Sequence, residues 1–306
     1  MEHVISTKQF LDRARLEALL DRAALFERQE ETGIPQLLQG KLLASVFYEP
    51  STRTRFSFEA AMLRLGGQVI MTEAASHFSA VKKGESLEDT IRVLGGYADV
   101  IVLRHPEKGS AERASKVSPV PLINAGDGAG EHPTQALLDL FTIRKECGTV
   151  DGLSIACIGD LLYGRTVHSL LRLLGLYKVK ISLHAPPELK LPEEYISELR
   201  ENGITIEERE GMDGVENADV VYVTRVQRER FSSDEEYQKV KGSYVIDEDW
   251  LQKLKPQAVI MHPLPRIDEI APEVDKDPRA AYFRQAKNGV YVRMALLAHV
   301  LGVENG

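Results

Sequence analysis

Cysteine is scarce, and this scarcity limits what the chain can be. The two cysteines, Cys147 and Cys157, lie ten residues apart with no CxxC pair, which excludes a disulfide framework and a cysteine-rich zinc site. No apolar run approaches the ~18 residues of a membrane span, and the first ten residues lack the basic and apolar regions of a signal peptide. We therefore expect a cytoplasmic protein that does not contact the membrane.

Positive charge is also in short supply. The 306 residues include 38 Lys and Arg against 46 Asp and Glu, a net charge of −8. Such an acidic chain is a poor non-specific ligand of nucleic acid, because phosphate backbones are bound mainly by clustered cations. We expect small-molecule partners and no nucleic acid, and any anionic partner must be met by cations that are concentrated locally.

Helical and apolar strand-like segments alternate along the chain, and 43 % apolar residues suffice for two cores. Short strands separated by helices predict parallel sheets that are covered on both faces. We expect two α/β domains, each with a mainly parallel sheet flanked by helices, and a cleft between them. Strands are expected at 42–49, 68–73, 98–105, 120–124, 153–160, 178–186, 204–208, 219–225 and 258–265. Helices are expected at 7–31, 53–66, 87–95, 133–147, 164–175, 193–202 and 279–303.

Binding sites in such folds lie beyond the carboxyl ends of strands, and the first segment of this kind is STRTR at 51–55. Arg53 and Arg55 fall in the first helical turn, where the macrodipole disfavours a cation by roughly 0.3–1 kcal/mol. A bound phosphate would satisfy the helix N–H groups and both guanidinium groups. We favour a phosphate site over the alternative, a surface helix that Ser51 merely caps.

Three more polar residues follow strands in the first half. Arg104 ends a strand and is weak support by itself. His132 precedes the helix at 133–147, where the positive helix end favours a neutral imidazole that can polarise a carbonyl; a capping side chain in a glycine loop is the alternative. Gln135 can donate and accept, which suits a carboxamide-like group.

In the second half, arginines again follow strands. Arg165 belongs to GDLLYGRT at 159–166, which has the glycine spacing of a Walker A loop but Arg in place of its Lys, and no GxGxxG. Arg225 and Gln227 follow a later strand. Guanidinium groups bind carboxylates in a bidentate manner, so these residues suit an acidic substrate.

Two further segments are less specific. In MHPLPR, the carbonyls of Pro263 and Leu264 end a strand and can accept from an NH₂ group, with a rigid loop as the alternative. Ser79 and Lys83 lie in a segment that we predict to be a surface loop, where a lysine by itself usually only adds solubility. The sequence shows no metal-ligand cluster, no Ser-His-Asp or Cys-His arrangement and no cofactor motif. Catalysis by positioning and electrostatics therefore remains, and transfer of an acyl-like group from an acyl phosphate fits best.

The motifs together resemble those of the carbamoyltransferase family. They span residues 47–266, and HPLPR and TRVQ are typical of its aspartate branch. The matching segments are FYEPSTRTRFSFE, KKGES, RHP, GEHPTQALLDL, GDLLYGRTVHSL, TRVQRER and MHPLPR.

The resemblance assigns roles to the first group of residues. The phosphate of carbamoyl phosphate would be held by Ser51, Thr52, Arg53, Thr54 and Arg104. Thr54, Arg104 and His132 would polarise the carbamoyl oxygen. Gln135 and the loop of Pro263, Leu264 and Pro265, whose Leu264–Pro265 bond is expected to be cis, would bind the carbamoyl NH₂ group.

The same resemblance implies that Arg165, Arg225 and Gln227 clamp the two carboxylates of L-aspartate. Ser79 and Lys83 would enter the site of a neighbouring subunit, where Lys83 would also contact aspartate, so a homotrimer with shared active sites is expected. Residues 1–132 and 285–306 would form the carbamoyl phosphate domain, and 133–284 the aspartate domain, with 133–147 as the linking helix. Any regulatory subunit would be a separate chain, because this one lacks a zinc-binding cysteine set.

The implied reaction is attack of the uncharged aspartate amine on the carbamoyl carbon, with phosphate as leaving group and proton acceptor. Two rival hypotheses remain at this point. One is a carbamoyltransferase for another amine, such as ornithine. The other is a protein without enzymatic activity that senses phosphate or binds a nucleotide through the Walker-like loop.

Overall fold

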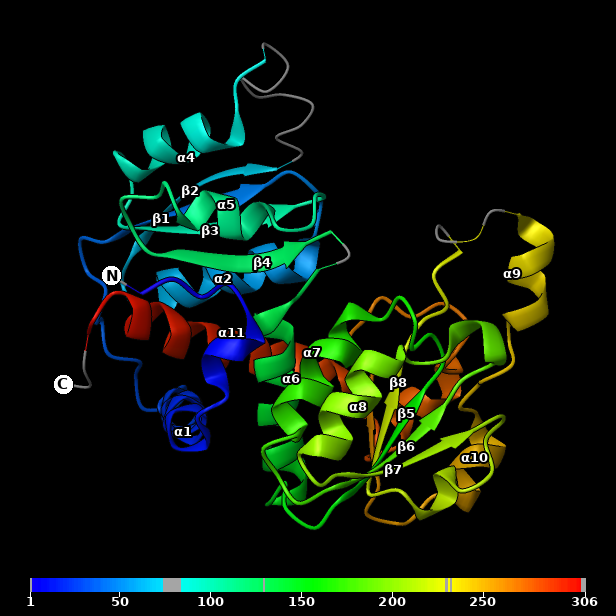
Figure 1. The fold of residues 1–306 in the computed structure, drawn as a ribbon. Coiled ribbons are helices and arrows are strands. Elements are labelled where there is room, and N and C mark those ends of the chain that lie inside the picture. Colours follow the sequence, from blue (N-terminus) through cyan, green and yellow to red (C-terminus); the bar gives the residue numbers. More distant parts are fainter. Residues whose placement is uncertain (1, 74–83, 129, 229–230, 232, 304–306) are drawn as a thin grey trace. The chain divides into compact units, whose positions relative to one another are not determined.

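The chain forms two compact units, each built on a parallel sheet (Figure 1). The computed structural model describes residues 2–73, 84–128, 130–228, 231 and 233–303. Unit 1 comprises residues 1–138 and 287–306, and unit 2 comprises 139–286. The predicted fold class of two parallel sheets flanked by helices is confirmed.

Unit 1 contains a four-stranded sheet in the order β2-β1-β3-β4. Every adjacent pair is parallel, as expected for apolar strands such as LLASVF and VIVLRH that are separated by helices. The strands are β1 (Leu42–Phe47), β2 (Gln68–Glu73), β3 (Val100–His105) and β4 (Leu122–Asp127).

Helices cover both faces of this sheet. Alternate residues of β1 and β3 pack on one face against α4 (Leu87–Gly95) and α5 (Ser110–Ser115) in a single apolar cluster. On the other face Ser45 of β1 donates to Glu59 of α2 (Thr52–Arg64) at 3.0 Å. The alternation of side chains along a strand thus sends Ala44 and Val46 to one face and Ser45 to the other.

The ends of the chain also belong largely to unit 1. The single helix predicted over 7–31 is wrong, because Asp12 accepts from Ala14 N and Arg15 N and so begins a new helix. The segment divides into a short 3₁₀ helix, η1 (Thr7–Phe10), and α1 (Arg13–Arg28). The last helix, α11, spans Tyr282–Val300, shorter than predicted at its start because Ile260 pairs with the backbone of residues 279–281.

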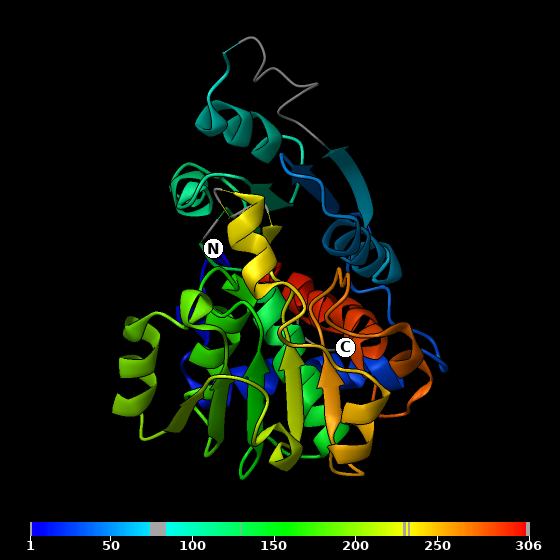
Figure 2. The same cartoon turned by 90° about the vertical axis from the view of Figure 1, so that its right-hand side faces the viewer.

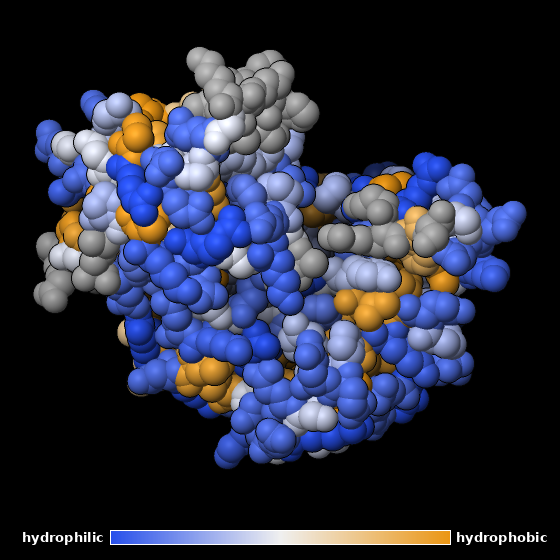
Figure 3. Space-filling view, turned by 45° about the horizontal axis from the view of Figure 1, so that its top comes forward, coloured by the Kyte–Doolittle hydropathy of each residue, from blue (hydrophilic) through white to orange (hydrophobic). Residues whose placement is uncertain are grey.

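Among the described residues, one edge of the sheet in unit 1 is paired with a further segment and the other is not. Val4 pairs with Ile123 along β4, whereas β2 is an edge strand that exposes Ile70 and Met71, the latter by 55 %. Leu63 of α2 and Tyr97, which follows α4, are also exposed. Figure 3 shows hydrophobic patches that interrupt an otherwise hydrophilic surface.

Unit 2 contains a five-stranded parallel sheet in the order β7-β6-β5-β8-β9, and Figure 2 shows its strands lying side by side. Its strands are β5 (Ser154–Ile158), β6 (Lys180–His184), β7 (Thr205–Arg209), β8 (Val220–Val223) and β9 (Val259–Met261). Its helices include α6 (Pro133–Cys147), which begins in unit 1, α7 (Arg165–Leu174), α8 (Glu193–Glu201), α9 (Asp234–Val240) and α10 (Glu248–Lys253). The short helices α5, α9 and α10 are absent from the sequence-based prediction.

One apolar cluster of unit 2 lies on one face of β5, β8 and β9. Ala156, Val221 and Ile260 pack in one cluster with apolar residues from the segments that follow β8 and β9. On the opposite face the hydroxyl of Tyr222 donates to Asp139 of α6 at 2.7 Å. Burial and the adjacent carboxylate raise the pKa of this tyrosine well above its ordinary value, so the hydroxyl remains a donor.

Candidate active site

Each sheet reverses its strand order once, and several of the predicted site residues, among them Arg53, Arg165 and Arg225, follow the strands at these points. In unit 1 the chain runs from β1 to β2 on one side and continues at β3 on the other side of β1. In unit 2 it runs from β5 through β6 to β7 and then returns to β8 beside β5. Such switch points leave a crevice beyond the carboxyl ends of the two diverging strands, where ligands bind.

The segment after β1 distinguishes the two interpretations of STRTR in one respect, the hydrogen bonding of Ser51. Ser51 is the N-cap residue of α2, yet among the described residues no backbone N–H of the first turn donates to its hydroxyl. A serine that does not cap leaves both its hydroxyl and the helix N–H groups for an anion. Thr52 and Arg53 are exposed at this end, whereas Thr54 is buried. The geometry favours the anion site over the capped helix.

The prediction that both arginines of STRTR face the anion is wrong for Arg55. Its side chain is buried, and its guanidinium lies 3.1 Å from Glu73 of β2 and 3.9 Å from Glu59. The sequence could not reveal this pairing, because Glu73 is 18 positions away and meets α2 only through the sheet. Arg53 is exposed, although nearby atoms remove some of its water and lower the pKa of its guanidinium.

Arg104 lies in β3, directly across the switch point from the end of β1. It is the register partner of Phe47, and its carbonyl accepts from Tyr48 N at 2.9 Å. Its guanidinium donates to Ala125 O at 3.2 Å and lies 3.2 Å from Glu49, with 12 % of the side chain exposed. Arg104 and the STRTR segment therefore lie at the same end of the sheet, where the carboxyl ends of β1 and β3 meet.

His132 and Gln135 stand at the start of α6, and a polar loop fixes their position. His132 is buried, and its carbonyl accepts from Gln135 N at 3.0 Å. The preceding Glu131 is anchored by Asp127, which accepts from its N–H at 2.9 Å, and by the hydroxyl of Thr7 at 2.7 Å. The histidine is thus held at a helix N-terminus, as predicted.

The switch point of unit 2 is organised by Asp160, a residue that the sequence analysis missed. Its carboxylate accepts from Tyr163 N at 2.8 Å, and Gln227 approaches it through N at 3.4 Å and Nε2 at 3.5 Å. Asp160 is fully buried, and burial raises the pKa of its carboxyl above the ordinary value. An aspartate in a GD pair directly after a strand is the only sequence signal that could have identified it.

Asp160 thereby joins the two loops that carry the predicted carboxylate-binding residues. Arg165 is the first residue of α7, and Arg225 and Gln227 follow β8. The hydroxyl of Thr224 lies 2.9 Å from Ile158 O and 3.1 Å from Asp160 O, which ties the end of β8 to the end of β5. Arg165, Arg225 and Gln227 are all half-buried.

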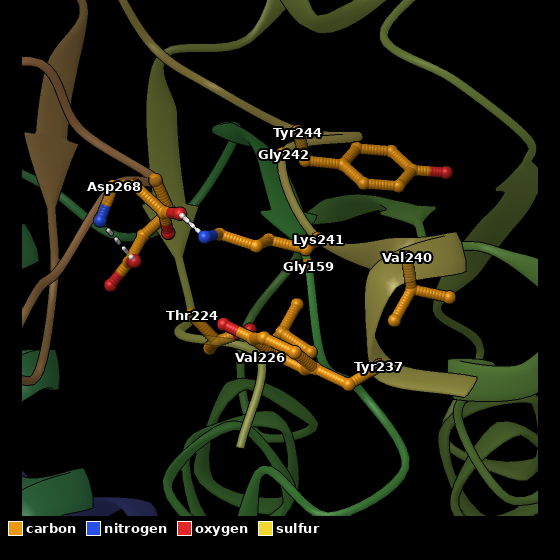
Figure 4. Close-up of a pocket in the computed structure, with 10 residues that line it drawn as sticks. Gly159, Thr224, Val226, Tyr237, Val240, Lys241, Gly242, Tyr244 and Asp268 are labelled. Atoms are coloured by element: carbon orange, nitrogen blue, oxygen red, sulfur yellow. Dashed lines mark hydrogen bonds and ion pairs between the residues drawn. The ribbon is translucent and has the colours of Figure 1, made fainter. Parts of the chain in front are cut away.

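A small pocket lies beside these loops (Figure 4). Gly159 and Thr224 contribute from the strand ends, and Tyr237 from α9. Lys241 extends toward Asp268, with 3.8 Å between its Nζ and a carboxylate oxygen. Gly159 has φ of 106°, and a Cβ there would stand 2.4 Å from Thr224 O, so only glycine fits between β5 and β8.

The loop after β9 carries Pro263, Leu264 and Pro265. The Leu264–Pro265 peptide bond is cis, as expected, and Leu264 has φ of 52°. Ser79 and Lys83 lie outside the described residues. Within the described ranges, no group of three or more His, Cys, Asp or Glu side chains is arranged to hold a metal ion, and no helix is long and apolar enough to cross a membrane.

Two family profiles cover nearly the whole chain. Residues 2–145 match the carbamoyl-P binding domain of aspartate/ornithine carbamoyltransferases, and residues 151–300 match the Asp/Orn binding domain.

Curated relatives carry related names. The aspartate carbamoyltransferase catalytic subunit of Methanocaldococcus jannaschii is 53 % identical over 310 residues, with 100 % of both chains covered. That of Thermococcus gammatolerans is 53 % identical over 302 residues, covering 98 % of this chain and 97 % of the relative. The multifunctional protein pyr1-3 of Dictyostelium discoideum is 55 % identical over 98 % of this chain, which spans only 14 % of that longer protein.

Solved structures agree with this likeness. The catalytic subunit of M. jannaschii aspartate transcarbamoylase superposes with a TM-score of 0.92 at 51 % identity, covering 99 % of this chain and 98 % of that one. Aspartate transcarbamoylase from Trypanosoma cruzi in complex with carbamoyl phosphate and aspartate superposes with a TM-score of 0.91 at 44 % identity, covering 97 % and 95 %.

Proposed function

We propose that this chain, which belongs to the aspartate/ornithine carbamoyltransferase family, uses the residues at its two switch points to transfer a carbamoyl group to L-aspartate. Its activity is that of an aspartate carbamoyltransferase, an enzyme of pyrimidine biosynthesis that produces N-carbamoyl-L-aspartate and phosphate. The observation that carries the assignment of residues is the uncapped Ser51 followed by the exposed Arg53 at the β1/β3 switch point.

In unit 1 the phosphate of carbamoyl phosphate would bind at the start of α2. Ser51, Thr52, Arg53 and Thr54 would contribute hydroxyls, a guanidinium and helix N–H groups, and Arg104 would approach from the adjacent strand. These groups combine charge-assisted hydrogen bonds with the positive helix end, a match for a dianion. The position of Arg104 and of the start of α2 at the carboxyl ends of two neighbouring strands supports this proposal.

The carbamoyl group would be bound on two sides. Thr54, Arg104 and His132 would donate to its oxygen, and Gln135 with the carbonyls of Pro263 and Leu264 would accept from its NH₂ group. Donors held in fixed positions by the fold would stabilise the tetrahedral oxyanion without a further reorganisation cost.

In unit 2 the two carboxylates of aspartate would bind Arg165, Arg225 and Gln227, with Lys83 of a neighbouring subunit as a further contact. The uncharged amine attacks the carbamoyl carbon, the C–O bond to phosphate breaks, and the departing phosphate takes the amine proton. Asp160 supports this assignment, because it ties Gln227 to the loop that precedes Arg165.

The Walker-like loop argues against the rival nucleotide-binding function. Between Gly159 and Arg165 the N–H groups of Tyr163 and Arg165 are used by Asp160 and by Tyr163 O, respectively. A P-loop instead presents its successive N–H groups to a phosphate. The loop is therefore closed around its own carboxylate.

A side-by-side assay with aspartate and ornithine as acceptors tests the proposed substrate. Aspartate alone should be carbamoylated; turnover of ornithine alone would refute the assignment. Binding of ATP that persists in Arg53→Ala, in a protein with no carbamoyl transfer, would instead support the nucleotide-binding alternative.

We also propose a homotrimer with shared sites, formed in part through the edge of unit 1. An exposed strand edge with apolar side chains such as Ile70 and Met71 is a common site of association. Ser79 and Lys83 come within ten residues of the end of β2, so association through this edge would bring them near the neighbouring subunit. Separate regulatory chains are a further proposal, which the words "catalytic subunit" in the names of the Methanocaldococcus and Thermococcus relatives support.

The domain roles and the location are proposals of the same kind. Residues 1–132 with 285–306 would bind carbamoyl phosphate, and 133–284 would bind aspartate, with 133–147 linking them. The cytoplasm suits the two free cysteines, of which Cys157 is buried within β5.

A further inference from the structure

In the loop after β9, Leu264 has a backbone conformation that is unfavourable for a leucine. Leu264 has φ of 52°, in the left-handed region where the Cβ atom crowds the backbone. Pro263 and Leu264 are also the residues whose carbonyls the proposed function assigns to the carbamoyl NH₂ group. Something must hold this conformation, because a relaxed loop would turn the carbonyls away.

We propose that His262, whose ring is oriented by Glu269, is a positioning residue that holds the carbonyls of Pro263 and Leu264 toward the carbamoyl NH₂ group. The proposal rests on the function proposed above and extends it to a residue that does not touch the substrate.

The imidazole of His262 fixes the loop directly. Its Nδ1 accepts from Leu264 N at 2.7 Å. This N–H lies between the carbonyls of Pro263 and Leu264 along the backbone, so the bond fixes the segment that carries both. Its Nε2 lies 2.7 Å from Oε1 of Glu269, and because Nδ1 is the acceptor, we assign the ring proton to Nε2. The backbone N–H of His262 donates to Gln285 at 2.9 Å, which ties the start of the loop to α11.

Glu269 in turn keeps the ring from rotating. Its second carboxylate oxygen accepts from the N–H groups of Ile267 and Asp268, each at 3.2 Å. Its own carbonyl accepts from Ile246 N at 3.0 Å. Burial acts to raise the pKa of Glu269, but the hydrogen bonds from His262 and the backbone lower it below the ordinary value, so the carboxylate stays charged.

The His262–Glu269 pair is almost completely buried. The side chains of His262 and Glu269 are only 1 % and 7 % exposed. Well-packed apolar residues commonly replace such a buried pair without loss of stability, so packing alone does not require it. What apolar residues cannot supply is an acceptor for Leu264 N–H at a fixed point.

The test compares substitutions that keep or remove this acceptor in the full-length enzyme. His262→Ala removes it, whereas the amide oxygen of His262→Asn can stand where Nδ1 stands; both leave Glu269 without its imidazole donor. His184→Ala is the matched control, because His184 is also buried in unit 2 and bonds Gly211 O and Ser182 Oγ at 2.9 Å each.

We expect His262→Ala to lower kcat/KM for carbamoyl phosphate roughly 10- to 100-fold, since small misplacements of binding groups have effects of this size. Inhibition by inorganic phosphate, which carries no NH₂ group, should change less than about twofold. His262→Asn should recover most of the loss, and His184→Ala should lower stability in urea without this kinetic change. If His262→Ala does not fold, His262→Gln replaces it, because its longer side chain reaches toward Glu269 and not toward Leu264 N.

The proposal would be overturned if His262→Asn lost as much kcat/KM as His262→Ala, or as His262→Gln where that variant is used. The same loss of kcat/KM in His184→Ala would overturn it too. A parallel loss of phosphate inhibition would also count against it, because the defect would then extend beyond the NH₂ contacts. Failure of the proposed function would be distinct: the unsubstituted enzyme would not carbamoylate aspartate at all.

Discussion

Arg55 of α2 lies 3.1 Å from Glu73 of β2, and this ion pair separates two arginines that the sequence places two positions apart. Arg55 is buried beside the sheet, while Arg53 remains exposed at the helix start. A helix places residues two apart on different faces. One arginine therefore stabilises the unit, and the other remains available to a ligand.

This relationship predicts opposite effects for two similar substitutions. Arg53→Ala should lower kcat/KM by roughly 10²–10³, the usual effect of removing one electrostatic contact to the reacting group, with little change in unfolding free energy. Arg55→Ala should cost about 1–3 kcal/mol of stability, because it leaves the partly buried Glu73 without its cation. Steady-state kinetics and urea unfolding on both variants separate the roles; a loss of stability in Arg53→Ala alone would contradict them.

The second prediction concerns the aspartate carboxylates. Arg225→Ala should raise the KM for aspartate roughly 100-fold, since a bidentate charged contact is lost, while the affinity for carbamoyl phosphate changes little. Arg228→Ala is the matched control, because Arg228 is exposed and pairs with Asp234 at 2.7 Å. Initial-rate kinetics with each substrate varied in turn provide the measurement. Equal losses of affinity for both substrates in Arg225→Ala would show that the assignment is wrong.

The third prediction tests shared sites. Lys83→Ala and Arg53→Ala subunits should each have very low activity when pure. Mixed after reversible dissociation, they should regain part of the activity, because some sites would receive an intact Arg53 from one subunit and an intact Lys83 from its neighbour. Activity is measured on mixtures in which a size or charge tag confirms hybrid trimers. Confirmed hybrids without activity would exclude sharing.

The fourth prediction is a pH-dependent contribution to stability from Glu30. Its carboxylate accepts from Lys287 at 2.7 Å and from Tyr291 at 2.5 Å, and these bonds lower the pKa of Glu30 below its ordinary value of 4.5. The unfolded chain binds this proton more readily than the folded one. The contribution is therefore complete above pH 4.5 and is lost as the pH falls through the lowered folded-state pKa.

Glu30→Gln should accordingly lower the unfolding free energy by about 1 kcal/mol at pH 7, a modest value because the carboxylate is partly exposed. The difference from the unsubstituted protein should shrink as the pH is lowered below the ordinary pKa. Urea unfolding across this pH range measures it, with the exposed neighbour substituted in Glu31→Gln as control. A difference that does not depend on pH would rule out this linkage.

Much of the fold and of the site follows from local patterns. Each strand is recognised from its own apolar run, such as LLASVF or SIACI. The alternation of these runs with helical segments then predicts two parallel sheets. The position of Arg53 and Arg165 at helix starts is also local. The sequence further carries the motifs that place the chain in its family, and these name the residues of the proposed site.

The short helices α9 and α10 escaped prediction because six or seven residues carry too little periodicity, and their caps, Ser233 and Asp247, resemble ordinary turn residues. Likewise Asp12 divides an apparently continuous helical segment by capping a new one. In these places one local signal competes with another, and only packing decides between them.

The sequence by itself determined the strands and most of the longer helices, because these depend on neighbours within a few positions. Only the tertiary structure decided the order of the strands, and with it the pairing of Arg55 with Glu73, the link from Asp160 to Gln227 and the support of Leu264 by His262. The first two contacts join segments that are distant along the chain, and the third depends on a backbone turn that Glu269 and α11 hold in place. Their free energy depends on the whole folded unit, so no local pattern encodes them.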